Sequence, residues 1–135
     1  MKSFVISLLL LASSTLLQAA INQSCKADGE PASYIRVHGR LMVYNGGYPN
    51  LRLWQIGTHH LFGIFSDMSD LRCARGGACN GDEDTRLPGN LKRMNLLDSA
   101  VYGDFEIRVL EPFKAGHMQA ACIVDAQRIV RGGSN

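Results

Sequence analysis

The sequence lacks the short motifs that identify the commoner enzymes. It contains no G-x-S-x-G nucleophile elbow, no H-E-x-x-H zinc motif, no G-x-x-x-x-G-K-S/T phosphate loop and no Rossmann glycine pattern. These absences count against the common hydrolases and nucleotide-binding proteins. Internal repeats, low-complexity tracts and a linker between domains are also missing from the 135 residues, so we expect one folded domain.

The chain also has little excess charge of either sign. It carries 14 Lys and Arg residues against 12 Asp and Glu residues, which gives a formal net charge of +2. Proteins that bind nucleic acid or anionic lipid usually have a strong and clustered positive charge. We therefore expect no nucleic-acid partner.

No hydrophobic run is long enough for a membrane-spanning helix. The apolar stretch at 4–17 is interrupted by Ser and Thr and falls short of the roughly 20 residues that a span needs. It follows Lys2 and ends in the small residues Ala19 and Ala20, which is the order of a secretory signal peptide. We expect residues 1–20 to be removed and residues 21–135 to form the mature domain. The protein would then be periplasmic or secreted, without stable membrane insertion.

The cysteine content predicts disulfides. All four cysteines follow the predicted signal peptide, and an even count in an exported chain is typical of a disulfide framework. Three pairings can be drawn. We favour Cys73 with Cys79, across a short glycine-rich segment, and Cys25 with Cys122, which ties the start of the mature chain to its last strand. Zinc bound by Cys73, Cys79 and a histidine is disfavoured by the spacing, and we expect no metal or cofactor.

Alternation of apolar and polar residues predicts strands at 33–44 and 102–110. Turn residues delimit further strands at 51–56 and 60–65, and residues 118–130 form a final strand or pair of strands. The first three strands form an antiparallel meander. Gly39 indicates a bulge or a closely packed neighbouring chain. The adjacent residues Ile123 and Val124 require a bulge or burial on two faces. The expected core residues are Leu41, Val43, Leu53, Ile56, Ile64, Phe105, Ile107, Ile123 and Val124.

The segment between the two groups of strands differs in composition. Residues 66–90 are polar and glycine-rich, which predicts a long loop restrained by the Cys73–Cys79 pair; loops of this length are usually functional or mobile. Helical spacing of apolar residues, with Asn90 as a cap, predicts a short helix over 91–97. The predicted fold is mainly β: a single antiparallel β-sandwich or small barrel with one short helix, cross-linked by disulfides.

Two patterns in the strand region have a recognisable form. Residues 39–46 read G-R-L-x-x-Y-N-G and residues 54–63 read W-x-I-G-T-x-x-x-x-G. Together with segments 103–106 and 118–124, they resemble a group of small exported bacterial proteins of uncharacterised function. The resemblance covers most of the mature chain and implies one intact exported domain, but it implies no catalytic or binding residues.

Two polar clusters could bind a metal ion. His59 and His60 lie beside a turn, but neighbouring strand residues point to opposite faces, so an exposed turn with one ring packed on the sheet is the favoured interpretation. Asp82, Glu83 and Asp84, with Asn80 and Asp67 or Asp70, could supply oxygen ligands to calcium. They lack the spacing of an EF-hand loop, which favours a solvated acidic turn.

Aromatic residues gather around the first two turns. Tyr44, Tyr48, Trp54 and Phe62 could form an exposed interaction surface. The simpler interpretation, which we favour for Trp54, is a core aromatic, because large aromatic side chains dominate burial in small domains.

The strand at 102–110 carries two carboxylates on one face. Asp104 and Glu106, at positions i and i+2, could in principle serve a glycosidase. The acid and the nucleophile usually come from different elements, so we expect no catalysis from this pair.

These observations favour an exported, non-catalytic binding or interaction module for a protein or an envelope component. The alternatives are a hydrolase of envelope polymer that uses loop carboxylates or histidines, and a structural or stress-related envelope component. We expect the predicted loop at 67–90 to present side chains to a partner. The candidate interaction residues are Tyr44, Tyr48, Trp54, His59, His60, Arg72, Arg75, Asp82 and Asp84.

Overall fold

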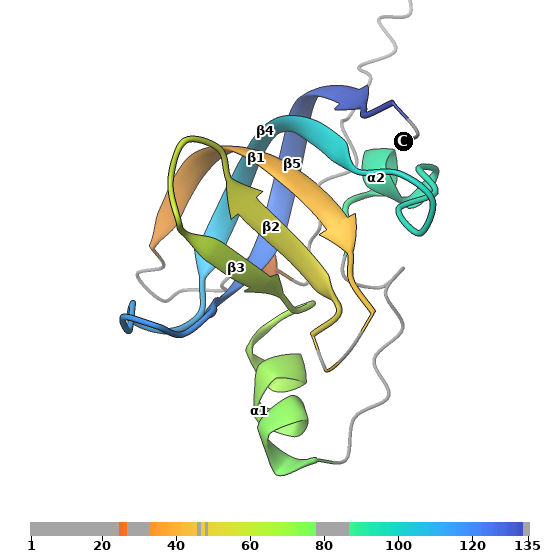
Figure 1. Ribbon diagram of the computed structural model, residues 1–135. Helices are drawn as coiled ribbons and strands as arrows, with labels where there is room; N and C mark the ends of the chain where they lie inside the picture. The colour runs from red at the N-terminus through yellow and green to blue at the C-terminus, as the bar shows by residue number, and fades with distance from the viewer. Residues whose placement is uncertain (1–24, 27–32, 46, 48, 78–86, 134–135) are drawn as a thin grey trace, which may run out of the picture.

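The structure of the chain is a computed structural model that describes residues 25–26, 33–45, 47, 49–77 and 87–133. The predicted signal peptide lies outside these residues. The described part contains five strands and two helices (Figure 1). In chain order they are β1 (Tyr34–Val43), β2 (Leu51–Gln55), β3 (Leu61–Ile64), α1 (Met68–Gly76), α2 (Gly89–Lys92), β4 (Val101–Val109) and β5 (Gln119–Arg131). All five predicted strands are confirmed, with ends within one residue of those expected.

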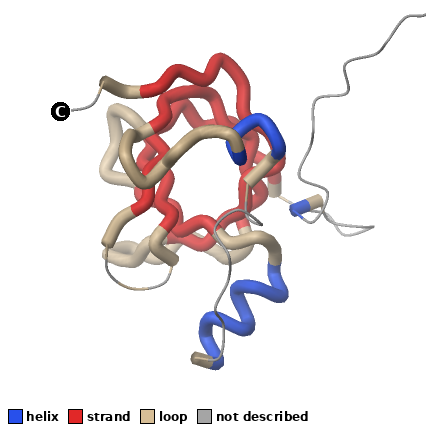
Figure 2. The backbone as a smooth tube through the Cα atoms, turned by 90° about the vertical axis from the view of Figure 1, so that its right-hand side faces the viewer, coloured by secondary structure: helices blue, strands red, loops and turns tan. Residues whose placement is uncertain are grey.

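The strands close into a barrel in the order β1-β2-β3-β5-β4, with β1 pairing with both β2 and β4. The predicted meander is confirmed, but β3 and β5 pair in parallel, which departs from a purely antiparallel sheet. This order, with the helices between the third and fourth strands, is the arrangement of the OB-fold, a five-stranded Greek-key barrel. Figure 2 shows the strands as a ring, with α1 outside it.

Gly39 lies where three strands approach closely. It is opposite Gln55 of β2 and Gly103 of β4. A Cβ atom on Gly39 would be 2.6 Å from Leu53 Cδ1 and 3.0 Å from the carbonyl oxygen of Trp54. The close-packing interpretation of Gly39 is therefore confirmed, because a side chain at this position would collide with β2.

Apolar side chains fill the barrel interior. α2 lies at one end of the barrel (Figures 1 and 2). Leu91 of α2 and the nearby Leu87 and Leu96 pack onto the strand residues. The interior cluster consists of Val37, Leu41, Leu51, Leu53, Phe62, Ile64, Leu87, Leu91, Leu96, Val101, Phe105, Ile107, Ala121, Ile123 and Ala126. Val43 is half-buried against it.

A second apolar cluster lies on the outer side of β5, where α1 and Cys25 pack against the barrel. It consists of Cys25, Phe65, Leu71, Leu110, Ala120, Cys122 and Val124. The predicted Cys25–Cys122 disulfide is confirmed and lies within this cluster. Cys73 is also disulfide-bonded, whereas Cys79 lies outside the described residues.

The adjacent apolar residues of β5 are buried on two faces, as expected. Ile107 pairs with Ile123, whereas Glu106 pairs with Asp125, so Val124 is the extra residue of a register shift. Ile123 packs in the barrel interior and Val124 in the outer cluster.

The prediction of a loop throughout 66–90 is wrong over α1. Asp67 caps the helix, because its Oδ1 accepts a hydrogen bond from the Asp70 N–H at 2.9 Å. Gly77 ends it in the left-handed conformation, with φ 74°. Leu71 of α1 is buried in the outer cluster, and this packing stabilises a short helix whose composition is otherwise polar. No helix in the described part of the chain is long and apolar enough to cross a bilayer.

Two further sequence predictions need correction. The predicted helix over 91–97 is instead the shorter α2, which begins at Gly89 and ends at Lys92. Asn90 lies inside it rather than at its cap, and the Asn90 amide donates to the Ala126 carbonyl at 2.6 Å. Ile56 is not a core residue, because β2 ends at Gln55 and the Ile56 side chain is 37% exposed in the following turn. The other predicted core residues pack as expected.

Candidate functional site

Trp54 lies on the surface of the barrel, so the prediction that it belongs to the core is wrong. Along β2, Leu51 and Leu53 point inward, which turns the Trp54 side chain outward and leaves it 40% exposed. The indole Nε1–H donates to the carbonyl oxygen of Thr58 at 2.8 Å. This hydrogen bond crosses the β2–β3 turn and holds the exposed ring in one orientation.

Arg40 lies between two aromatic residues. It is directly opposite Trp54 on β2 and directly opposite Tyr102 on β4. The same row continues to Leu61 of β3, opposite Trp54, and to Val130 of β5, opposite Tyr102. We call these five residues the Arg40 band. Val130 is 60% exposed, so apolar surface is accessible at both the Trp54 and the Val130 positions of the band.

Tyr44 contacts two arginines, Arg40 of the band and Arg52 beside it. Arg40 Nη1 donates to the Tyr44 hydroxyl at 3.0 Å, and Arg40 Nη2 contacts Met42 Sδ at 3.1 Å. The Arg52 guanidinium lies over the Tyr44 ring, 5.2 Å from its centroid, which is a cation–π contact. The partners of Arg40 are uncharged, so these contacts fix its guanidinium without neutralising it.

Charge is unevenly distributed among the strands. β1, β2 and β3 contain no Asp or Glu, whereas β4 and β5 carry Asp104, Glu106 and Asp125. Glu106 faces Arg36 across the β1–β4 pair, but Tyr102 faces Arg40. The surface around Arg40 is therefore basic and aromatic, whereas Arg36, towards the other end of β1, faces a carboxylate.

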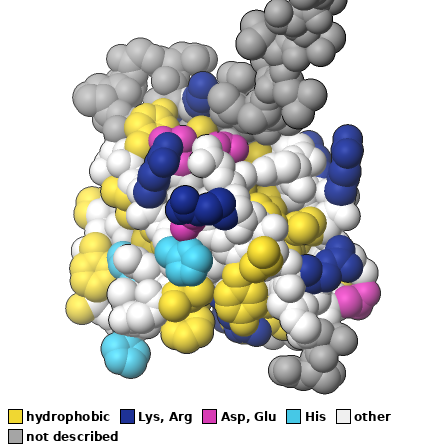
Figure 3. Space-filling model, turned by 90° about the horizontal axis from the view of Figure 1, so that it is seen from above, with side chains coloured by type: hydrophobic (Ala, Val, Ile, Leu, Met, Phe, Trp, Pro, Cys, Tyr) yellow, Lys and Arg dark blue, Asp and Glu magenta, His cyan; other side chains and the backbone are white. Residues whose placement is uncertain are grey.

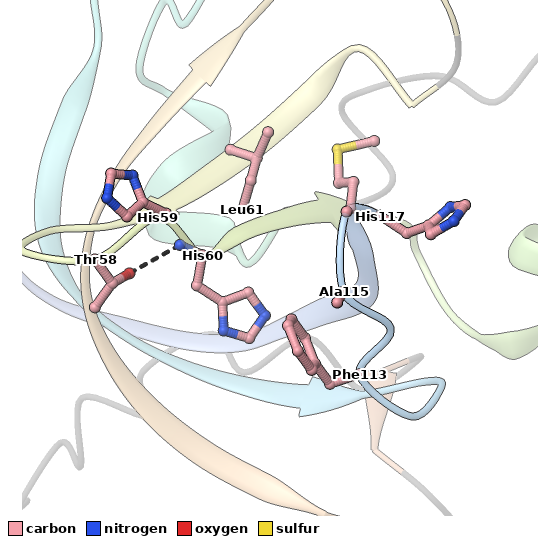
Figure 4. Close-up of a pocket in the computed structure, with 9 residues that line it drawn as sticks. Thr58, His59, His60, Leu61, Phe113, Ala115 and His117 are labelled. Atoms are coloured by element: carbon pink, nitrogen blue, oxygen red, sulfur yellow. Dashed lines mark hydrogen bonds between the residues drawn. The ribbon is translucent and has the colours of Figure 1, made fainter.

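A pocket opens next to the band, between the β2–β3 turn and the β4–β5 loop. Its volume is about 600 Å³. It shares Leu61 with the Arg40 band, and its Thr58 holds the Trp54 indole. Figure 4 shows the ring of His60 next to that of Phe113 at this pocket. The pocket is lined by Thr58, His59, His60, Leu61, Phe113, Ala115, Gly116, His117 and Met118.

His60 closes one side of this pocket, whereas His59 is exposed. The His60 ring stacks on Phe62 with centroids 4.2 Å apart, and its edge meets Phe113 at 5.1 Å. His60 Nε2 is 2.8 Å from Gln119 Oε1, and the Gln119 amide donates to the Glu111 carbonyl at 2.9 Å. The expected arrangement of a turn with one histidine packed on the sheet is confirmed.

Asp104 is engaged by a hydrogen bond and an ion pair. Its carboxylate is 2.9 Å from His38 Nδ1 and also pairs with Arg128. The hydrogen bond with His38 and the Arg128 guanidinium together lower the pKa of Asp104, against the opposing effect of desolvation. A glycosidase acid needs a raised pKa, so Asp104 is unsuited to that role. From above, basic, acidic and histidine side chains lie close together among hydrophobic ones (Figure 3).

The remaining candidate residues do not converge on the band. Arg72 is exposed on α1, and Arg75 pairs with Glu111 at the start of the β4–β5 loop. Asp70 accepts hydrogen bonds from the Ser66 N–H and hydroxyl at 2.8 and 3.0 Å. These bonds stabilise the chain just before the first turn of α1. Tyr48, Asn80, Asp82, Glu83 and Asp84 lie outside the described residues. Within the described ranges, no group of three or more His, Cys, Asp or Glu side chains could hold a metal ion.

Comparisons with protein-family models, with curated proteins and with solved structures find no match for this chain. The resemblance noted from the sequence therefore stays a prediction.

Sequence reasoning identified Tyr44, Trp54 and the two turn histidines, but it missed Arg40 and Tyr102. The alternation of β1 already indicated that Arg40 shares a face with Arg36 and His38. Its aromatic neighbours depend on the register of β1 with β2 and β4, which the alternation leaves open.

Proposed function

We propose that the protein is an exported, non-catalytic binding module that attaches to a component of the cell envelope through the Arg40 band and the adjoining pocket. The single observation that supports this most is Trp54, a large aromatic side chain that is exposed and yet held by a hydrogen bond to Thr58. Exposed aromatic residues beside arginine are typical of binding surfaces. A fixed ring also loses little conformational entropy when a ligand covers it.

The proposal of export rests on the predicted signal peptide and is supported by the Cys25–Cys122 disulfide, since disulfides persist in oxidising compartments. The OB-fold supports many unrelated functions, so the barrel by itself does not define the ligand. Hydrolysis is the weaker candidate, because the carboxylate of Asp104 is engaged by His38 and Arg128 and its lowered pKa does not suit a catalytic acid.

A sedimentation assay tests this function. The exported chain is mixed with washed envelope fragments, and the bound fraction is compared for the native protein and Trp54→Ala. The matched control is Leu97→Ala, which removes a side chain that is 67% exposed in the segment after α2, outside the band and its pocket. We expect Trp54→Ala to weaken binding at least tenfold and Leu97→Ala to leave it unchanged. Equal binding by all three proteins would contradict the proposed site.

A further inference from the structure

We infer that the ligand of the Arg40 band is an acidic polysaccharide, whose sugar rings pack on Trp54 and Tyr102 while a carboxylate pairs with Arg40. This inference rests on the proposed function and names the ligand class for the same surface.

The charge of the band indicates an anionic ligand. The partners of Arg40 are the Tyr44 hydroxyl and the Met42 thioether, both uncharged. β1, β2 and β3 supply no carboxylate, and the residues opposite Arg40 are Trp54 and Tyr102. A guanidinium held in this way can present its remaining N–H groups to a carboxylate, in the planar geometry that arginine favours.

The aromatic residues indicate rings on either side of that carboxylate. Trp54 and Tyr102 are two strands apart with Arg40 between them, which corresponds to about 10 Å across the sheet. The electron-rich face of an aromatic ring attracts the C–H groups on the apolar face of a sugar. The indole N–H already donates to Thr58, so Trp54 offers its ring rather than its donor.

The close approach of Gly132 to Tyr102 supports the same surface. A Cβ atom at Gly132 would be 2.8 Å from Tyr102 Cε2 and 3.2 Å from the Ala100 carbonyl oxygen. The glycine therefore lets the Tyr102 ring lie against the backbone at the end of β5.

Two other anionic polymers fit the observations less well. Single-stranded nucleic acid usually binds in a groove of many positive charges, whereas this chain has a net charge of only +2 before the predicted cleavage. A uniformly acidic peptide would pair with Arg40, but its charged side chains would offer no flat apolar face to the two separated aromatic rings.

Trp54 is the only tryptophan of the chain, so its fluorescence reports directly on the band. The exported protein is titrated with polygalacturonate, which carries carboxylates, and with dextran, which is neutral. Poly-L-glutamate and oligothymidylate represent the acidic peptide and the nucleic acid. We expect polygalacturonate to change the emission at the lowest concentration and its binding to weaken as salt is raised.

The arginine variants then test the charge. Arg40→Ala should weaken polygalacturonate binding about tenfold or more. Arg36→Ala is the matched control, because it removes the same charge from the same face of β1 at a position opposite Glu106. Its affinity should stay within about twofold of the native protein. Circular dichroism and urea unfolding verify that both variants are folded.

Each other outcome overturns a defined part of the inference. If dextran binds as tightly as polygalacturonate, charge has no role in binding. If Arg40→Ala and Arg36→Ala lose the same affinity for polygalacturonate, Arg40 is not the specific contact. Tighter binding of poly-L-glutamate or oligothymidylate would replace the polysaccharide by that class. If none of the polymers binds while Trp54-dependent attachment to envelope fragments persists, the inference fails and the proposed function stands. If that attachment is absent as well, both fail.

Discussion

Removing the Cys25–Cys122 disulfide should destabilise this domain more than any single contact on its surface. The bridge joins residues separated by 97 positions, and the chain-entropy model gives about 4.7 kcal/mol for a loop of about 100 residues. Small domains have a total stability of only about 5 to 15 kcal/mol. The double variant Cys25→Ala with Cys122→Ala should therefore lose between about a third and nearly all of the native stability.

The loss is measured by urea unfolding followed by far-ultraviolet circular dichroism. With a urea dependence of about 1 to 3 kcal/mol per molar, the midpoint should fall by at least about 1.5 M. Both cysteines are fully buried in the outer cluster, so lost packing adds to the entropic effect.

The control is the double variant Cys73→Ala with Cys79→Ala. If these residues form the predicted bridge, the loop is short and the same model gives a loss of about 2 kcal/mol. A loss below about 1 kcal/mol in the Cys25–Cys122 variant would refute the reasoning. A larger loss in the control than in the Cys25–Cys122 variant would also show that loop length does not determine the effect.

Three other predictions concern the barrel. Phe105→Ala should cost about 3 to 5 kcal/mol in urea unfolding, because the side chain is fully buried, whereas Ile56→Ala should change stability by less than about 0.5 kcal/mol. Gly39→Ala should cost about 1 to 3 kcal/mol, because its methyl group would collide with β2; an unchanged midpoint would contradict this packing. The lowered pKa of Asp104 means that its ionised form stabilises the folded state above about pH 4, and that this contribution is lost as the pH falls through the folded-state pKa. Asp104→Asn should thus be less stable than the native protein at pH 7, with a difference that shrinks at about pH 3 in the same assay. A difference that does not change with pH would exclude the contacts with His38 and Arg128 as its cause.

The strands could be predicted because their alternation of apolar and polar residues is regular and local. From Val37 onward, the apolar residues of β1, such as Leu41, face the interior as their spacing indicated, whereas Ile35 is exposed. Ile56 was wrongly assigned on its apolar character alone. Strict alternation from Leu51 and Leu53 would place it on the outward face with Trp54, and β2 ends before it.

α1 was missed although its sequence carries local signals. Asp67 is an N-cap, Gly77 is a left-handed C-cap, and Met68, Leu71 and Ala74 recur every three residues on the face that packs on the barrel. The polar composition of the segment outweighed these signals in the prediction. The helix also depends on the outer side of β5, a surface that exists only once the barrel has closed.

The Arg40 band depends on the same alternation as the core. Leu53 points inward and Trp54 outward, so a slip of one residue between β1 and β2 would bury the indole and expose the leucine. Gly39 opposes such a slip, because its missing side chain makes room for Leu53 at the register that places Arg40 opposite Trp54. Residues of the barrel interior therefore determine which side chains meet on its outer face. For this reason, a binding defect in an interior variant such as Gly39→Ala would indicate a shifted register rather than a ligand contact.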